Sequence, residues 1–450
     1  MDSRRAWAVL IVATFAYVVG VLQRSSMGVA GVAATERFAI DATALSSLGV
    51  LQLLVYALLQ IPVGVLVDRF GPRVLIVTGA ATMGLGQLLV AVADDLPLAI
   101  VGRVLVGAGD AMTFISVLRL LGSWFSPRRL PHLSQWVGTL GQSGQLLSAI
   151  PFAAVLQLSG WTTAFASAAS VSVIAVIAVL VAVRDAPAGT LSNRSSSLGA
   201  ALSSLRESMR HPGTRLGFWA HAATQSSGAM LSLLWGFPML SIGLGYGPAA
   251  AAGLLAGMVV VAAVAGPIIG LLSARFPFRR SNLVLGIVGA MAVAWSVVLL
   301  WPGIPPFAVV AMLLAVVAAG GPGSLIGFDF ARTYNPPVRH GAASGFVNLG
   351  GFAVTVVIIL VVGLLLDAQS PGAVPEQLYA WEHWRLALAA QAPIIGIVVV
   401  LLLVARRRTR RRLQEDEGIA VGPLWEAIVR RHRARRAGRE DGGGDVEQWS

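Results

Sequence analysis

Charged side chains are rare in this chain, and three of them stand inside long apolar segments where they could do chemistry. Arg24 lies in the segment 6–29, and Arg103 and Asp110 lie in the segment 97–121. A charge at the centre of a bilayer costs at least about 2.5–3.5 kcal/mol, so such residues are functional candidates. A guanidinium binds a carboxylate or phosphate through two parallel hydrogen bonds. A buried aspartate beside it can alternate between paired and protonated states, which would link proton movement to anion binding.

The spacing of these residues determines which of them can meet. Arg103 and Asp110 are seven residues apart, on one helix face, and about 10 Å apart along the axis. They cannot pair directly, and the gap leaves room for Arg24. Tyr17 lies seven residues before Arg24 and shares its face, so we expect it beside the same ligand. A purely structural ion pair between Arg24 and Asp110 is the alternative.

Other polar residues in apolar segments are further candidates for substrate contact. His221 and Gln225 are four residues apart and share one helix face with other polar residues. His221 could also titrate. Interhelical hydrogen bonds explain such residues as well. The predicted substrate-contacting set in these segments is His221, Gln225, Gln142 and Asn348. Arg119, near the end of its segment, is expected to snorkel to the lipid headgroups.

The elements that must position these residues are membrane-spanning helices. The chain has 450 residues, 56% hydrophobic and 12% charged, with a mean hydropathy of +0.76. A water-facing surface demands more charge, whereas about 20 apolar residues cross a hydrocarbon core about 30 Å thick. We therefore predict an all-α integral membrane protein with twelve transmembrane helices, at 6–29, 44–66, 74–93, 97–121, 133–157, 162–183, 216–241, 249–273, 282–301, 306–330, 343–366 and 384–405.

The predicted helices fall into two pseudo-symmetric bundles of six. The loop GVLVDRFGPR (64–73) after the second helix recurs loosely as GLLSARFPFRR (270–280) after the eighth. Two parallel six-helix repeats place a substrate site between them. The predicted parts are an N-terminal bundle, a cytoplasmic linker, a C-terminal bundle and a basic, largely disordered tail: 1–183, 184–215, 216–405 and 406–450.

Charge sets the orientation and excludes several function classes. All 33 basic residues are arginines, and they gather at the N-terminus, in alternate loops and in the tail, whereas the other loops are mainly acidic. The positive-inside rule then predicts a multi-pass protein of the cell membrane with both termini in the cytoplasm. This topology explains the net charge of +12. We therefore expect the lipid bilayer as a partner and expect no nucleic acid. Without cysteine there are no disulfides or thiolate metal sites, and without lysine there is no nucleotide-binding P-loop. We expect no cofactor, no metal and no enzymatic activity.

The loop after the second helix carries a recognisable motif. Its residues, in the pattern Gly-x-x-x-Asp-Arg-x-Gly-x-Arg, are Gly64, Asp68, Arg69, Gly71 and Arg73. Together with Arg103, Gly107 and Gly109 in the fourth helix, they resemble the signatures of the major facilitator superfamily, and this resemblance covers 1–405. It implies alternating access and a gating role for the loop, with Asp68 accepting hydrogen bonds from the start of the eleventh helix, near 342–345. Topology alone would account for the arginines. Asp329 and Arg332 are predicted to form a gate pair that echoes this loop.

The first and fourth helices resemble those of anion–cation symporters within that superfamily. The stretch YVVGVLQRSSMGVA carries Arg24, and the Arg-x6-acid spacing recurs from Arg103 to Asp110. The resemblance implies that Arg24 binds a substrate carboxylate and that Asp110, with Arg103, couples protons. Here Asp replaces the usual Glu, and Gln23 stands where some relatives carry an acid. We predict a proton-coupled transporter of a small organic anion, functional as a monomer. The alternatives are a drug or metabolite exporter and a transporter-like membrane sensor.

Overall fold

The computed structural model describes residues 3–38, 42–187, 198–369 and 379–418, and these contain helices and no strand. The first half of the chain forms α1 Arg4–Val29, α2 Gly31–Phe38, α3 Ala42–Phe70, α4 Pro72–Val92, α5 Leu96–Trp124, α6 Leu130–Leu147, the π-helix η1 Ser148–Phe152 and α7 Ala153–Ala182.

The second half forms a similar series, preceded by a short linker helix. Its elements are α8 Leu198–Arg210, α9 Pro212–Met230, η2 Leu231–Trp235, α10 Gly236–Pro238, η3 Met239–Gly243, α11 Gly247–Arg275, η4 Pro277–Arg279, α12 Arg280–Leu299, α13 Phe307–Ala318, α14 Gly320–Ser324, α15 Ile326–Thr333, η5 Pro337–Arg339, α16 His340–Gln369, α18 Trp381–Ala389 and α19 Gln391–Glu417.

The predicted all-α membrane class is confirmed. Ten helical segments among the described residues are long and apolar enough to cross a membrane. One of them, Leu130–Ala182, runs over 53 residues and covers two predicted helices, which are separated where Gly160 leaves the helical conformation with φ +76°. The predicted helix 216–241 is helical from α9 to η3, but this polar segment is not among the ten.

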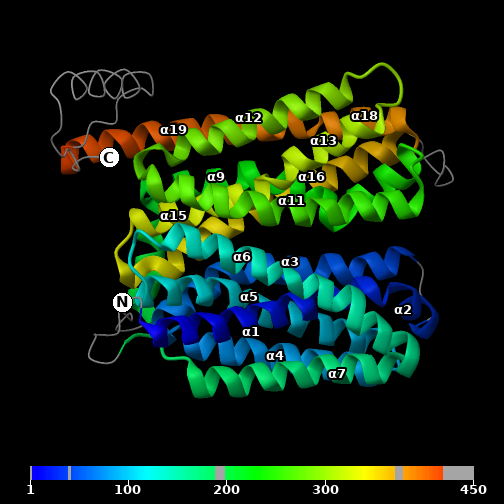
Figure 1. Ribbon diagram of the computed structural model, residues 1–450, viewed down its shortest axis with the longest axis horizontal. Helices are drawn as coiled ribbons and strands as arrows, with labels where there is room; N and C mark the ends of the chain where they lie inside the picture. The colour runs from blue at the N-terminus through cyan, green and yellow to red at the C-terminus, as the bar shows by residue number, and fades with distance from the viewer. Residues whose placement is uncertain (1–2, 39–41, 188–197, 370–378, 419–450) are drawn as a thin grey trace, which may run out of the picture.

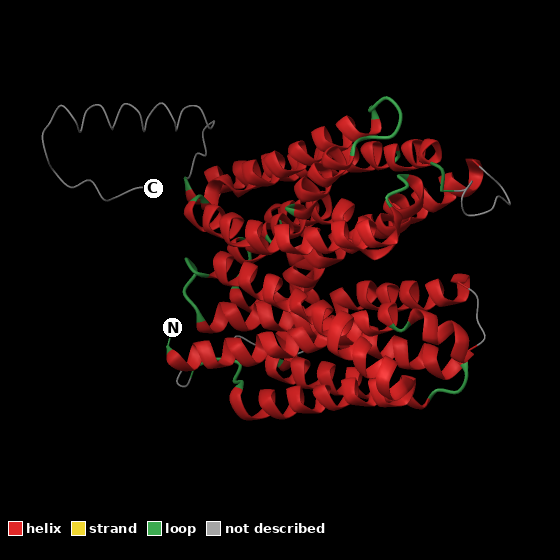
Figure 2. Cartoon of the chain, turned by 45° about the vertical axis from the view of Figure 1, so that its right-hand side comes forward, coloured by secondary structure: helices red, strands yellow, loops and turns green. Residues whose placement is uncertain are grey.

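The helices gather into two groups that lie side by side. In Figure 1, α1 to α7 lie together in the lower part and α9 to α19 in the upper part, with their long axes roughly parallel. Figure 2 shows the same two layers of helices from another side. We call the end of the molecule at which α1 begins and α19 ends the terminal end.

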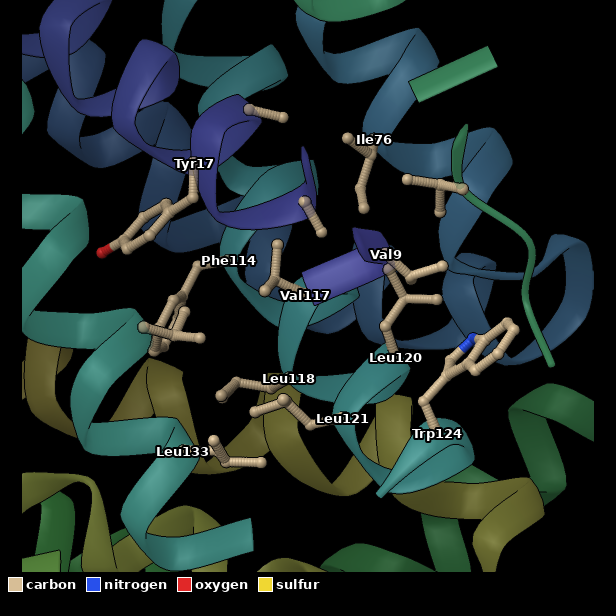
Figure 3. Close-up of a cluster of buried hydrophobic side chains, with 14 of the residues drawn as sticks. Val9, Tyr17, Ile76, Phe114, Val117, Leu118, Leu120, Leu121, Trp124 and Leu133 are labelled. Atoms are coloured by element: carbon tan, nitrogen blue, oxygen red, sulfur yellow. The ribbon is translucent and has the colours of Figure 1, made fainter. Parts of the chain in front are cut away.

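Each group has an apolar core, and the core of the first group extends into the second. Figure 3 shows Val9 and Tyr17 of α1 packed with Val117, Leu120 and other α5 side chains. The same buried cluster includes side chains of α15 and α16, namely Phe328, Ala331, Ala343 and Val347. The two groups are therefore packed together through a shared core near the terminal end.

Glycines bring the two groups into direct backbone contact where α3 crosses α16. A Cβ added to Gly64 would lie 2.6 Å from the carbonyl oxygen of Gly341 and 3.1 Å from Cα of Ala342. A Cβ added to Gly345 would likewise meet Gln60 and Gly64. Because the obstructing atoms at Gly64 belong to the backbone, no side-chain rotation can make room for a larger residue.

A larger side chain at position 64 is therefore expected to separate α3 from α16. We expect Gly64→Val to destabilise the packed α3–α16 crossing by about 1–3 kcal/mol through overpacking, which is about a 5- to 150-fold change in the equilibrium between the packed and the separated crossing. The chain has no cysteine, so Ser344→Cys on α16, a buried position, gives a single reporter. Labelling of this cysteine by a maleimide in detergent should accelerate in the Gly64→Val background.

The matched control is Gly289→Val on α12, where an added Cβ meets nothing within 4 Å. This substitution should leave the labelling rate unchanged. Equal labelling rates in the Gly64→Val and Gly289→Val backgrounds would show that a larger side chain at position 64 does not separate α3 from α16.

Candidate functional site

Arg24 and Asp110 form an ion pair between α1 and α5. Nη1 of Arg24 lies 3.1 Å from Oδ2 of Asp110, and the side chains are 25% and 1% exposed, respectively. Oδ1 of Asp110 is buried and has no hydrogen-bond partner among the described residues. The pair thus joins a partly exposed guanidinium to a carboxylate that is closed off from solvent.

Arg103 is attached to the backbone of α1. Its Nη2 donates to the carbonyl oxygen of Arg24 at 3.1 Å and also to Oε1 of Gln52 on α3. The structure thus places Arg24 between Arg103 and Asp110, as the helical spacing predicts. Gln52 was missed because nothing in its sequence context distinguishes it from other polar residues. Arg103 fixes the backbone that carries Arg24.

Two tyrosines flank the Arg24 guanidinium. The Tyr17 hydroxyl lies beside it, and the Tyr56 ring of α3 lies with its centroid 5.8 Å from Cζ of Arg24. Tyr17 is in the predicted site set, whereas Tyr56 is not, because its proximity depends on how α3 packs against α1. Arg24 therefore has aromatic neighbours as well as an acidic partner.

Asn348 of α16 connects the second group of helices to this site. Its Nδ2 donates to Oε1 of Gln60 at 2.6 Å and to the Tyr56 hydroxyl at 3.3 Å. Tyr56 thus contacts both Arg24 and Asn348. Gln60, like Tyr56, was absent from the predicted site.

His221 and Gln225 of α9 are both bonded to Ser324 of α14. Nδ1 of His221 lies 3.0 Å from the Ser324 carbonyl oxygen, and the Ser324 hydroxyl donates to Oε1 of Gln225 at 3.1 Å. The His221 ring packs against Phe328 with centroids 5.0 Å apart. Phe328 in turn packs against Phe114, the ring neighbour of Tyr17. The histidine is thus joined to the Arg24 region by a chain of aromatic contacts.

Gln142 is bonded within its own helix. It accepts a hydrogen bond from Gln145 on α6, and the contacts found for it do not include Arg24 or His221. Its predicted role as a substrate contact is therefore the least supported by the geometry.

Asp68 bridges the two groups of helices at the terminal end. Its Oδ1 accepts from the backbone N–H of Gly341 at 2.8 Å, and its Oδ2 accepts from that of Ala342 at 2.7 Å. Free N–H groups and the positive end of the helix dipole make such a helix start a favourable place for a carboxylate. The contact predicted from the loop motif is present, shifted by one residue toward the helix start.

Arg119 corrects one prediction from the sequence. It does not snorkel to the headgroups, because its side chain is only 6% exposed and its Nε lies 3.4 Å from Oδ1 of Asp68. The carboxylate on α3 gives this arginine of α5 a buried partner, which the position of Arg119 in its own segment does not reveal. Asp68 thus joins α3, α5 and α16.

The remaining motif residues shape the same loop. Gly71 has a φ of +87° just before α4, a conformation that favours glycine. The backbone N–H of Arg73 donates to Oδ1 of Asp185 at 2.7 Å, and its side chain donates to the Leu180 carbonyl oxygen at 2.6 Å. Arg69 packs over the neighbouring Phe70 ring. Arg73 therefore connects α4 to the end of α7 and takes no part in the bridge itself.

Asp329 and Arg332 of α15 pair and reach the first group of helices. Oδ1 of Asp329 lies 2.5 Å from Nη2 of Arg332, and its Oδ2 accepts from the Ser273 hydroxyl at 2.6 Å. Arg332 also donates to the Ser134 hydroxyl oxygen on α6 at 2.9 Å. Beside this contact, Gln135 donates to the carbonyl oxygen of Pro322 at 2.7 Å. These bonds form a second bridge between the two groups.

The described residues contain no group of three or more His, Cys, Asp or Glu side chains that could hold a metal ion. The Arg24 guanidinium can bind an anion in the place that Asp110 now takes, and the bonds of Asp68 and Arg332 hold the two groups of helices together at the terminal end.

The fold and the buried ion pairs define a multi-pass helical membrane protein. A family model described as "Major Facilitator Superfamily" matches residues 13–352. The chain belongs to this superfamily.

Two comparisons add detail. A "Probable L-galactonate transporter" of Escherichia coli (strain K12) is 26% identical over 151 residues, which cover 34% of this chain and 33% of that protein's length. A crystal structure of a bacterial homologue of the human lysosomal transporter Spinster, inward-facing and unoccupied, superposes with a TM-score of 0.60 at 16% identity, covering 90% of this chain and 98% of that one. At this identity the structural match supports the fold alone.

Removing either member of the Arg24–Asp110 pair is expected to have unequal effects on stability. Arg24→Gln leaves a closed-off carboxylate without its partner and should destabilise the protein by about 3–5 kcal/mol. Asp110→Asn should lower the free energy of unfolding by less than Arg24→Gln does, because Arg24 keeps some contact with solvent. The double substitution leaves no unpaired carboxylate, so it should recover much of the loss. Denaturant unfolding in detergent, arranged as a double-mutant cycle, measures these differences.

The exposed pair Arg37–Asp94, at 2.8 Å on the surface, is the matched control. Its double-mutant cycle should give a coupling of less than about 1 kcal/mol. Additive effects at Arg24 and Asp110 would show that the two residues do not depend on each other.

Proposed function

We propose that this protein is a secondary active transporter that carries a small organic anion together with protons by alternating access. The observation that carries the proposal is the Arg24–Asp110 pair, in which the arginine is partly exposed and the aspartate is closed off. We further propose that it acts as a monomer in the cell membrane with both termini in the cytoplasm, as its arginine distribution predicts.

The chemistry of the pair links the anion to the proton. A substrate carboxylate that binds Arg24 competes with Asp110 for the same guanidinium. Once displaced, Asp110 is a buried carboxylate without its partner, which is unfavourable unless it takes up a proton. When the substrate leaves, the proton also leaves and the pair forms again. Anion and proton therefore move in the same direction, as in a symporter.

The surroundings of Arg24 favour a hydroxylated monocarboxylate. The Arg103 guanidinium is already bonded to the Arg24 carbonyl oxygen and to Gln52. Of the two arginines, Arg24 is therefore the one that can bind a substrate carboxylate, and a single cation fits a single carboxylate. The Tyr56 hydroxyl, Gln60 and Asn348 supply donors and acceptors suited to hydroxyl groups. The name of the partial relative, a probable L-galactonate transporter, agrees with an acid of this kind.

The bridges at the terminal end act as the gate in this proposal. Asp68 holds the start of α16, and Arg332 holds α6, so the described conformation is closed at this end. α1 begins and α19 ends at the terminal end, which therefore faces the cytoplasm in this proposal, so access to Arg24 in this conformation is from the opposite side of the membrane. Opening requires both bridges to break.

The transport proposal is tested with the full chain reconstituted into liposomes. We expect a pH gradient, acidic on the side of substrate addition, to drive uptake of L-galactonate or a similar hydroxylated carboxylate. Arg24→Ala should abolish uptake, because the carboxylate loses its cation. Asp110→Asn should abolish proton-driven accumulation, because an amide cannot exchange a proton, while exchange of labelled substrate across the membrane persists.

Arg37→Ala, outside the site, should leave uptake unchanged. Uptake of cationic drugs that is insensitive to Arg24→Ala would contradict the anion assignment and favour an exporter. Tight ligand binding without any flux would favour a sensor.

The gate is tested separately by Asp68→Asn. The amide can accept hydrogen bonds through one oxygen instead of two and carries no charge, so we expect the closed state to lose about 2 kcal/mol, which is about thirtyfold. Transport should fall while insertion into the membrane remains intact, and the cysteine of Ser344→Cys should label faster. Asp94→Asn, at an exposed carboxylate, is the control. Unchanged transport and labelling would contradict the gating role.

A further inference from the structure

Arginines gather where α12 begins and where α19 leaves its apolar stretch. α12 starts at Arg280 directly after Arg279, and Arg406 follows the last buried apolar residue of this part of α19, Ala405. The two helices lie side by side at the upper edge of Figure 1 and share a buried cluster that contains Val284, Val288, Val398, Leu402 and Ala405. The arginines thus lie at the boundary between apolar and polar sequence, the depth at which lipid headgroups lie.

Three of these arginines lie close together. Arg406 and Arg410 are one helical turn apart and repel each other, and Arg410 is also repelled by Arg279. None of the three forms an ion pair within the part of the chain that the structure describes. The carboxylates that follow on α19, Glu415 and Asp416, pair with Arg411 and Arg412 instead.

Two donors in this cluster lack acceptors among the described residues. Nη1 of Arg279 and Nε of Arg406 are buried and have no hydrogen-bond partner among the described residues. Arg406 also donates to Oδ1 of Asn282 in the first turn of α12. An unpaired buried donor of a charged group costs about 1–3 kcal/mol or more. The cluster would be relieved by an anion that accepts several hydrogen bonds at once.

The start of α12 adds further donors. α12 has 20 residues, and Arg279 at its N-cap position makes no side-chain capping hydrogen bond. The first backbone N–H groups of a helix of this length, together with its dipole, favour a negative group at that point. Arg279 directly precedes this helix start, and Arg406 bonds to Asn282 in its first turn. Arg410 is close enough to Arg279 to be repelled by it, so all three arginines lie at the start of α12.

We propose that Arg279, Asn282, Arg406 and Arg410 form a binding site for a phosphate group, which we call the α12–α19 phosphate site. Guanidinium groups bind phosphate oxygens through paired hydrogen bonds, and the bound phosphate supplies both the missing acceptors and the missing negative charge. Because the cluster lies at headgroup depth, the phosphate belongs to an anionic phospholipid. The site is distinct from the Arg24 region and does not depend on the transport proposal.

The test measures the thermal stability of the full-length protein in detergent as phosphatidylglycerol, phosphatidylcholine or inorganic phosphate is added. We expect phosphatidylglycerol to raise the unfolding temperature and phosphatidylcholine to have little effect. In Arg406→Gln/Arg410→Gln, the phosphatidylglycerol concentration that gives half of the rise in unfolding temperature should be higher. We expect an increase of about fivefold for each arginine removed, because one basic residue near the membrane surface contributes about 1 kcal/mol to the binding of anionic lipid.

Arg407→Gln/Arg408→Gln is the matched control, because it changes the net charge equally at exposed positions of the same helix. It should respond to phosphatidylglycerol as the wild type does. Arg406→Lys/Arg410→Lys keeps the charge, tests for loss of fold and should retain most of the response. A stabilising effect of inorganic phosphate alone would assign the site to free phosphate. An equal loss of response in the Arg407 and Arg408 control would overturn the site, as would an unchanged response in Arg406→Gln/Arg410→Gln.

Discussion

The structure depends on one constraint, which is that a carboxylate buried in this apolar chain must have a partner. Asp68, Asp110 and Asp329 are all nearly inaccessible to solvent. Asp68 and Asp110 take partners from other helices, and Asp329 is held by Ser273 of α11 as well as by its neighbour Arg332. Each acid therefore fixes the position of one helix relative to another. The three acids determine where α1, α3, α5, α11, α15 and α16 meet, and an unpaired charge would be costly at each of these places.

The two bridges at the terminal end use different chemistry in pseudo-equivalent places. The first bridge joins the Asp68 carboxyl group directly to the backbone N–H groups at the start of α16. In the loop repeat of the second half, Ala274 occupies the position that corresponds to Asp68. The acid there comes from α15 instead, and the contact across the halves is made by Arg332 to the hydroxyl of Ser134. The first bridge has two hydrogen bonds to a carboxylate, whereas the second has one from a guanidinium and one neutral bond from Gln135 to Pro322. Because charge-assisted hydrogen bonds are the stronger ones, we expect the first bridge to contribute more to holding the terminal end closed.

The sequence predicts well those features that depend on spacing within one helix or on a motif. Arg24 lies between Arg103 and Asp110 because seven residues of helix separate the latter two, and Asp329 and Arg332 pair because they are three residues apart. Gln52, Tyr56 and Gln60 were missed because their importance depends on the rotation of α3 against other helices. The error at Arg119 has the same origin, since its partner Asp68 lies on α3. Gln142, selected for its polarity alone, bonds to Gln145 on its own helix.

The geometry of α3 and α16 gives a physical route between the proposed substrate site and the gate. α3 carries Tyr56 and Gln60 near Arg24 and, one to three turns further on, Gly64 and Asp68 at the crossing with α16. On α16, Asn348 bonds to Tyr56 and Gln60 two turns beyond the Gly341 that Asp68 holds. In the proposed mechanism, a substrate that binds Tyr56 and Asn348 would replace hydrogen bonds that also hold the two helices together. In that mechanism, substrate binding and the release of the Asp68 bridge would act on the same helix crossing, so their coupling would need no path through the rest of the protein.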